Sequence, residues 1–324
     1  MLSALVRARR VVARALVLSR KLIRRARPRP AGTMPAPLPA PALDLSQAVV
    51  IITGSTRGIG RALAEAFAAK GAAVVVNGRD AAAVDSLERE LRAAGARVRG
   101  VAANVAEPEG ASRLIEAALA SFGRIDVLIN NAAVIGPPRR PIWDVEPSEW
   151  EAVLRVNVSA GFFCARETAR WAIRAGSPVR IVNVSSGVVH SGAPLLGPYS
   201  VSKAAQQGLT TALTADAELL SPLVSAVSVE PRSVATAMTR SYFSHTEYAL
   251  MEPAESVVPV FLYAATAPAD AVAGKHLLEP AFAQDPGAEV VLNSPFATAP
   301  DLRPVPAYRW PPAGTPTGPR RFVT

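Results

Sequence analysis

The chain has 324 residues, half of them hydrophobic, which is enough apolar material for a buried core and argues against a disordered protein. Its formal net charge of +9 would suit a nucleic-acid or membrane partner, but ten of the 35 basic residues precede Ala31, and the first acidic residue is Asp44. Without those ten, the chain has 25 basic and 26 acidic residues. The remainder is therefore close to neutral, and nucleic-acid binding loses its main support.

The basic leader, residues 1–30, reads as an Arg-rich amphipathic helix without acidic residues. It has no apolar run long enough for a transmembrane segment or a secretory signal. The pattern is typical of an organelle transit peptide, most simply mitochondrial. A start set too early, with Met34 as the true start, is the equal alternative, and binding to an anionic membrane surface is a third. We expect an intracellular protein, located in mitochondria or another organelle if the leader is a transit peptide and in the cytoplasm otherwise.

Cysteine content agrees with a reducing compartment. The chain has one cysteine, Cys164, which cannot form an internal disulfide. It lies in a helical, Ala-rich stretch, so we expect a core residue rather than a nucleophile.

Beyond the leader, short β-branched runs alternate with helical patterns. Strands are expected at residues 48–52, 73–77, 98–102, 125–130, 179–184, 224–229 and 276–278, and helices at residues 61–70, 81–94, 108–122, 148–175, 199–220 and 253–267. This alternation predicts an α/β fold: one doubly wound domain over residues 46–280, with a mostly parallel seven-stranded sheet. Residues 1–45 are then leader and Pro-rich linker, and residues 281–324 a Pro-rich extended tail.

A glycine-rich loop connects the first strand to the first helix. Its sequence is Thr53-Gly54-Ser55-Thr56-Arg57-Gly58-Ile59-Gly60. Strand, glycine loop and helix form the context of a dinucleotide site, because glycines allow a tight turn close to the pyrophosphate and the helix N-terminus attracts its charge.

A second pattern places Tyr199 and Lys203 four residues apart at the start of a helix, on one face. A free tyrosine, with a pKa of about 10, is a poor acid or base at neutral pH. A fixed cation beside it stabilises the phenolate and lowers that pKa. Alone, such a pair is frequent by chance.

Together the motifs resemble the short-chain dehydrogenase/reductase family, over about residues 46–280. In chain order they are the glycine loop, Asn130-Asn131-Ala132-Ala133, Asn157, Ile181-Val182-Asn183-Val184-Ser185-Ser186, Tyr199-x-x-x-Lys203, and Pro231 with Thr236. The resemblance implies a Rossmann domain that transfers a hydride between a nicotinamide cofactor and a carbonyl/alcohol pair.

The resemblance also implies a catalytic set of four residues. Tyr199 would be the general acid or base, and Lys203 would lower its pKa and bind the nicotinamide ribose. Ser186 would bind the substrate oxygen, whereas Ser185 should point to the other side of its strand. Asn157 would hold a water that connects Lys203 to solvent.

Two arginines bear on the choice of cofactor. After the second strand, where an acidic residue would bind the adenosine ribose, the chain has Asn77-Gly78-Arg79. Arg79 and Arg57 offer two cations for a 2′-phosphate, so NADP(H) is favoured and NAD(H) is the alternative. Asp80 should cap the next helix. The resemblance implies cofactor contacts at Gly54, Ser55, Thr56, Arg57, Gly58, Ile59, Gly60, Arg79, Asn104, Val105, Asn131, Ala132, Tyr199, Lys203, Pro231, Val234 and Thr236.

Several positions depart from the family pattern. Ala133 replaces a glycine, which is tolerable unless the backbone there needs positive φ. Arg232 replaces the glycine after Pro231, where it could alter cofactor geometry or bind an acidic substrate group. His190 reads as a solvated loop residue, with a substrate contact as the alternative.

The segment with Tyr242, Phe243 and His245 should act as a substrate lid. Its aromatic residues suggest an apolar partner, or they pack against the body. With three scattered histidines and one cysteine, no metal site is expected.

The sequence thus predicts an NADP(H)-dependent oxidoreductase acting on a small carbonyl or alcohol, expected to form a homodimer or homotetramer through its two long helices. One alternative is a catalytically impaired NADP-binding sensor or scaffold of the same fold. Another is a membrane-surface protein whose leader is the active part.

Overall fold

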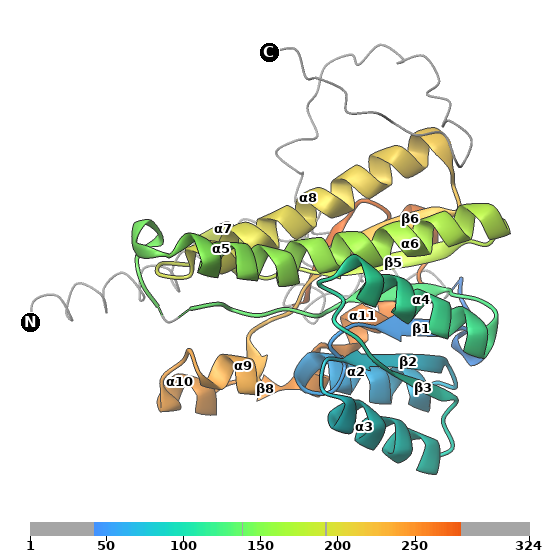
Figure 1. Ribbon diagram of the computed structural model, residues 1–324, viewed down its shortest axis with the longest axis horizontal. Helices are drawn as coiled ribbons and strands as arrows, with labels where there is room; N and C mark the ends of the chain where they lie inside the picture. Colours follow the sequence, from blue (N-terminus) through green and yellow to red (C-terminus); the bar gives the residue numbers. More distant parts are fainter. Residues whose placement is uncertain (1–41, 138, 192, 280–324) are drawn as a thin grey trace, which may run out of the picture. The chain divides into compact units, whose positions relative to one another are not determined.

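A computed structural model describes residues 42–137, 139–191 and 193–279 (Figure 1). These residues belong to one compact unit of the chain. The predictions for the basic leader and the Pro-rich tail lie outside the described residues. Among the helices that are described, none combines the length and the apolar character needed to cross a bilayer.

The core of the fold is a seven-stranded sheet in the order β3-β2-β1-β4-β5-β6-β9, with every neighbouring pair parallel. The strands are β1 Val49–Ile52, β2 Ala73–Gly78, β3 Val98–Ala102, β4 Val127–Asn130, β5 Val179–Val184, β6 Val224–Glu230 and β9 His276–Leu278. This confirms the doubly wound α/β fold. Strand order reverses between β1 and β4, and in such sheets ligands bind beyond the carboxyl ends of the strands at this point.

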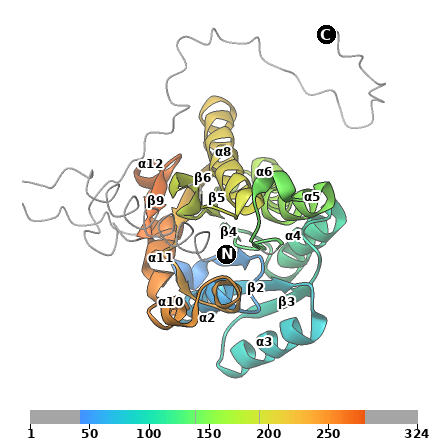
Figure 2. The ribbon, with the colours of Figure 1, turned by 90° about the vertical axis from the view of Figure 1, so that its left-hand side faces the viewer.

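Two helical layers cover the sheet (Figure 2). Because side chains alternate along a strand, Val50 and Ile52 of β1 pack into one core and Val49 and Ile51 into the other. The first core is covered by α2 Gly58–Ala69, α3 Ala81–Ala93 and α11 Val258–Thr266, and the second by α4 Pro108–Phe122, α6 Ala160–Ala175 and α8 Gly197–Leu220.

Cys164 lies fully buried in the second core, as expected. Burial raises the pKa of its thiol to about 12. The thiol is therefore protonated at neutral pH, which fits a packing residue and not a nucleophile.

The helix expected over residues 148–175 consists of three parts. These are α5 Pro147–Leu154, a π-helical turn at Arg155–Ser159, and α6. The π-helical turn contains Asn157. Single π-turns inside α-helices occur mostly at functional sites, and periodicity alone does not reveal them, because one added residue changes the hydrophobic pattern very little.

The sequence did not predict several short elements. They are η1 Leu45–Gln47, η2 Ile142–Asp144, α7 Val188–Ser191, β7 Val234–Ala235, α9 Ala237–Arg240, α10 His245–Ala249, β8 Glu252–Pro253, η4 Ala254–Val257 and α12 Ala269–Val272. Elements of two to five residues are too short to show a period. Those between β6 and α11 form the segment that we call the lid, residues 234–253.

Candidate active site

The glycine loop forms a cradle between β1 and α2 that no larger residue could form. Gly54 and Gly58 have positive φ angles of 62° and 55°. A Cβ on Gly54 would lie 2.9 Å from Ala132 Cα, and one on Gly60 would lie 2.4 Å from the carbonyl oxygen of Gly54. Glycine at these positions therefore lets the loop turn tightly and pack closely on its neighbours, the backbone form that a dinucleotide-binding loop requires.

Two asparagines hold this loop in place. Asn131 donates from Nδ2 to the carbonyls of Thr53 and Gly54, at 2.9 and 3.1 Å. Buried Asn77 accepts from the Gly54 amide through Oδ1 at 3.4 Å, and its Nδ2 is anchored to the carbonyls of Val101 and Ala103, at 3.0 and 3.1 Å. Asn131 was expected beside the cofactor, and its side chain supports the loop. The support by Asn77 was missed, because the sequence showed only that an acidic residue was absent there.

The other loop residues differ in exposure. Ser55 is buried, and its Oγ accepts from the Asn77 amide at 2.8 Å; Thr56 and Ile59 are half-buried. Arg57 and Arg79 are exposed, and in the described part of the chain no ion pair joins either one. Asp80 caps α3 by accepting from the Ala82 amide at 3.0 Å, as predicted.

After the carboxyl end of β3, Asn104 is exposed and Val105 is buried. Gly110 makes this arrangement possible, since a Cβ there would lie 2.0 Å from the Asn104 carbonyl oxygen. The Asn104 side chain accepts from the Ala106 amide at 3.3 Å. Ala132 packs on Gly54, and Ala133 has no positive φ, so the alanine at that position is accommodated.

Tyr199 lies at the start of α8, where the residue as a whole is half-buried. Burial raises its pKa, and a hydrogen bond with the Ser186 hydroxyl lowers it by less. The net direction is upward, contrary to the lowering expected from Lys203. In the structure, Tyr199 is thus a protonated hydroxyl paired with the serine that the sequence predicted.

Lys203 is fully enclosed and lies with Nζ 5.7 Å from the centroid of the Tyr199 ring. Nζ donates to the Val184 carbonyl at 2.8 Å and to Gln206 Oε1 at 3.0 Å. Burial lowers the pKa of the Lys203 ammonium to about 7. Because Lys203 is already neutral at the higher pH at which the Tyr199 hydroxyl would ionise, it does not bring the Tyr199 pKa down. Sequence reasoning missed Gln206, although its place one turn after Lys203 was a usable signal.

Asn157 occupies the π-helical turn and connects three segments. Its side chain exchanges two hydrogen bonds of 2.8 Å with the backbone of Val134. It also donates to Ser202 Oγ at 2.9 Å, and Ser202 donates to the Tyr199 carbonyl at 2.7 Å. Asn157 therefore links the loop after β4 to the turn of α8 that carries Tyr199 and Lys203.

The two serines at the end of β5 point to different partners. Ser186 bonds Tyr199, whereas Ser185 is buried and accepts from Gln207 Nε2 at 3.1 Å. This is the division that strand alternation predicted.

The lid closes over the glycine loop. Val234 is buried in β7, Pro231 is half-buried, and Thr236 caps α9 with its side chain. Thr236 Cγ2 would lie 3.3 Å from a Cβ on Gly58. Of the expected cofactor residues in this part of the chain, Thr236 thus lies directly across from Gly58 of the glycine loop.

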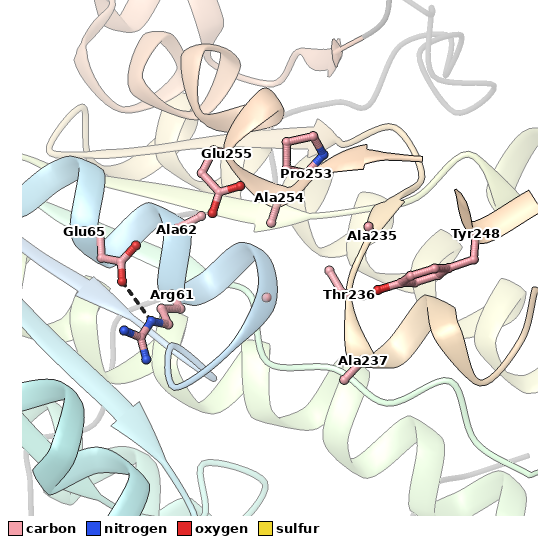
Figure 3. Close-up of a pocket in the computed structure, with 11 residues that line it drawn as sticks. Arg61, Ala62, Glu65, Ala235, Thr236, Ala237, Tyr248, Pro253, Ala254 and Glu255 are labelled. Carbon is pink, nitrogen blue, oxygen red and sulfur yellow. Dashed lines mark hydrogen bonds and ion pairs between the residues drawn. The ribbon is translucent and has the colours of Figure 1, made fainter. Parts of the chain in front are cut away.

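A cavity of about 360 Å³ lies between the start of α2 and the lid (Figure 3). Gly58, Arg61, Glu65 and Thr236 are among its lining residues, and the Tyr248 ring extends toward Thr236. Neither Tyr199 nor Ser186 lines it. It borders the cofactor side of the site and is not the space over the phenol.

Arg232 is neutralised by two carboxylates. It forms a bidentate pair with buried Glu279 and donates to Glu252 Oε1 at 2.7 Å. Of the two readings left open by the sequence, an acidic substrate group at Arg232 loses support, because its guanidinium is already paired.

The aromatic residues of the lid pack against the body. The Tyr242 hydroxyl donates to the carbonyls of Gly136 and Pro137, each at 2.9 Å. Arg139 donates to the Tyr242 carbonyl at 2.5 Å and lies 5.9 Å from the centroid of the Phe243 ring. The lid is therefore tied to the loop that follows β4.

Two of the three histidines are brought together by the fold. His190 and His276 both lie against Glu230, whereas His245 is exposed on α10. Burial raises the pKa of Glu230, but the hydrogen bonds from both histidines outweigh it and lower the pKa overall. The expectation of scattered histidines is wrong for this pair, because the sequence does not show that α7 meets β9.

Comparisons with known proteins agree with this geometry. A family model described as short chain dehydrogenase matches residues 48–247. A short-chain type dehydrogenase/reductase of Picea abies is 36% identical over 197 residues, covering 59% of this chain and 72% of the relative. A 3-oxoacyl-[acyl-carrier-protein] reductase of Synechocystis sp. is 35% identical over 198 residues, covering 61% and 78%.

Solved structures show the same fold with either cofactor. A protein of Beutenbergia cavernae with bound NADP at low occupancy has a TM-score of 0.65 and 31% identity, covering 73% of this chain and 97% of that one. A short chain dehydrogenase/reductase of Burkholderia phymatum in complex with NAD has a TM-score of 0.66 and 26% identity, covering 75% and 92%. With its glycine loop between β1 and α2 and the match over residues 48–247, the chain belongs to the short-chain dehydrogenase family and is an NAD(P)-dependent oxidoreductase.

Proposed function

We propose that the protein interconverts a small carbonyl compound and its alcohol with NADP(H), using Tyr199 as general acid or base. The observation that carries this proposal is the buried Tyr199 hydroxyl paired with the Ser186 hydroxyl, with Lys203 Nζ 5.7 Å from the ring. Both hydroxyls can address one substrate oxygen, as proton transfer to a carbonyl requires.

Ser186 and Tyr199 have different roles in the proposed reaction. Ser186 positions the substrate oxygen by a hydrogen bond, and Tyr199 donates its proton to that oxygen during reduction. The raised pKa of Tyr199 keeps its hydroxyl protonated until the substrate is bound. The bound nicotinamide supplies the hydride to the carbonyl carbon.

Lys203 restores the proton. Its pKa of about 7 leaves comparable amounts of ammonium and amine at neutral pH, which suits a group that gives and regains a proton. Asn157 and Ser202 hold the turn of α8 that places Lys203 beside Tyr199. We infer that Asn157 and Ser202 keep Lys203 in position beside Tyr199.

NADP(H) is the cofactor that the charges favour. Arg57 and Arg79 are exposed beside the glycine loop, without a carboxylate partner among the described residues. A 2′-phosphate would find two cations there, and no acidic side chain follows β2 before Asp80, which caps α3. Solved relatives bind either cofactor, so this preference rests on the two arginines.

We further expect self-association through the long helices. Phe162 and Ile173 of α6 and Val201 of α8 are apolar and exposed, at 47%, 53% and 42%. A dimer or tetramer that pairs these faces would bury them. Analytical ultracentrifugation of wild type and Phe162→Glu tests this, and an unchanged monomer in both would contradict it.

The function is tested by a panel of aldehydes and ketones, scored by oxidation of NADPH. Tyr199→Phe and Ser186→Ala should each lose at least about 100-fold in kcat on any active substrate, since general acid catalysis contributes that much. NADPH binding, followed by its fluorescence, should change little in Tyr199→Phe. Ser185→Ala is the matched control and should keep its kcat, because its hydroxyl bonds Gln207 instead. Full activity of Tyr199→Phe would refute the proposal.

A further inference from the structure

Three side chains from distant parts of the sequence meet beside the Ser186 turn. Nε2 of His190 lies 3.0 Å from Glu230 Oε2, and Nε2 of His276 lies 3.1 Å from the same oxygen. The three ligand atoms all lie within 4.8 Å of one another. The two imidazoles and the carboxylate thus bring three possible metal-ligand atoms close together.

The cluster stands on well-fixed backbone. Glu230 ends β6 and His276 begins β9, two strands that pair directly in the sheet. His190 lies in α7, four residues after Ser186. The side chains of Glu230 and His276 are only 12% and 10% exposed, whereas that of His190 is 28% exposed. Two ligands are therefore held rigidly, and the third stands at the side open to solvent.

Two imidazoles and one carboxylate form a donor set typical of a zinc site with an open position. Neighbouring ligand atoms around a tetrahedral zinc lie about 3.3 Å apart, for Zn–N distances near 2 Å. The two distances of 3.0 and 3.1 Å are close to that value, and a small movement of exposed α7 would bring the histidines nearer to each other.

We propose that His190, Glu230 and His276 bind a divalent transition-metal ion of the zinc class, with solvent at the remaining position. The site is separate from the nicotinamide site and is not needed for the proton transfer described above. In the described part of the chain no Lys or Arg pairs with Glu230, so its carboxylate is directed to the two histidines alone.

An outer partner is present as well. Gln207 lies 2.9 Å from His276 Nε2, 3.4 Å from its Nδ1, and 3.1 Å from Ser185 Oγ. The Gln207 amide is thus nearest to Nε2, the atom that would bind the metal, so metal binding requires the Gln207 side chain to move toward Nδ1, where its amide oxygen could accept from the Nδ1–H group. Such partners orient histidine ligands and raise metal affinity.

A bound ion would fix the segment that carries Ser186. A Cβ on Gly187 would lie 2.8 Å from Glu230 Oε1, so the carboxylate supports the backbone directly after Ser186. The ion would join α7 to β6 and β9, and so restrain the loop between Ser186 and Tyr199.

The test uses untagged full-length protein, equilibrated with Zn²⁺ and separated from free metal by gel filtration. We expect one zinc per chain by mass spectrometry of the metal, and an affinity measurable by competition with a chromophoric chelator. His190→Ala and Glu230→Gln should abolish stoichiometric retention. Gln207→Leu should weaken the affinity about 10-fold, as loss of an outer partner does.

His245→Ala is the matched control, because it removes the exposed histidine outside the cluster and should retain one zinc per chain. His190→Ala alters an exposed side chain, and its fold is checked by circular dichroism. Hydrogen exchange of residues 186–198 should slow on adding Zn²⁺ to wild type and not to His190→Ala. Wild type without retained zinc, or equal retention by wild type and His190→Ala, would show a hydrogen-bonded cluster only and overturn the proposal. None of these readouts depends on turnover.

Discussion

Lys203 donates from Nζ to Oε1 of Gln206 at 3.0 Å, with both side chains buried one turn apart on α8. An acceptor next to a buried ammonium stabilises its charged form. Gln206 is therefore a positioning residue that sets how readily Lys203 carries a proton.

Gln206→Leu should lower the Lys203 pKa further, because the ammonium loses this acceptor, and Gln206→Glu should raise it by adding a negative charge. The limb of the kcat–pH profile that reports Lys203 should accordingly move to lower pH in the first variant and to higher pH in the second. The measurement is kcat against pH with an active substrate of the carbonyl panel. Shifts in the same direction, or none in either variant, would contradict the assignment.

The stability of the fold should depend on pH through Lys203. Its pKa is about 7 in the folded protein against 10.5 for an ordinary lysine, so between these values the unfolded chain binds the additional proton. The free energy of unfolding should therefore rise as pH increases from 7 to 9, and the penalty for the buried ammonium is fully present below pH 7.

Lys203→Met should remove this contribution and flatten the rise. Urea unfolding of both proteins at pH 7 and pH 9 measures the difference, and the other titrating groups cancel in the comparison. The window stops at pH 9 because Tyr199 and Cys164, whose pKa values are raised by burial, act with the opposite sign at higher pH. Parallel pH dependences in the two proteins would disprove the account.

Cofactor choice should depend on Arg79. Arg79→Ala should weaken NADPH binding about 10-fold or more, since a charge-assisted hydrogen bond to phosphate is lost, and should leave NADH binding nearly unchanged. Titration calorimetry with both cofactors measures this. Arg174→Ala is the charge-matched control, because this exposed arginine ends α6, just before the amino end of β5, and should affect neither cofactor. Equal losses for NADPH and NADH in Arg79→Ala would refute the phosphate contact.

The pairing of Arg232 with Glu279 should matter for stability. Arg232→Ala leaves the Glu279 carboxylate buried without its cation and should cost about 3 kcal/mol in the free energy of unfolding. Arg232→Ala combined with Glu279→Gln should recover part of this loss, because the unpaired charge is gone. Arg155→Ala breaks the exposed pair with Glu107 and should cost no more than about 0.5 kcal/mol. A similar cost for Arg155→Ala and Arg232→Ala in urea unfolding would contradict the argument.

Much of this protein could be predicted from local patterns. The strands from Val49–Ile52 to His276–Leu278, the glycine loop and the Asp80 cap follow from periodicity and residue chemistry over a few neighbours. The family resemblance placed Ser186 and Tyr199 in one catalytic set, and the structure pairs their hydroxyls. Boundaries and short elements could not be predicted, and the lid between β6 and α11 is the main example, because its strands and helices have two to five residues.

The sequence by itself determined the fold class, the glycine cradle and the presence of Tyr199 and Lys203 on one helix face, since these depend on backbone preferences and hydrophobic period. Only the tertiary structure decided the partners of the charged groups. Lys203 gives its hydrogen bonds to Val184 and Gln206, Arg232 is paired with Glu279, and His190 meets His276 across Glu230. Except for Lys203 with Gln206, these contacts join segments distant in the chain. Burial in the assembled fold raises the pKa of Tyr199, which is opposite to the direction expected from Lys203 alone.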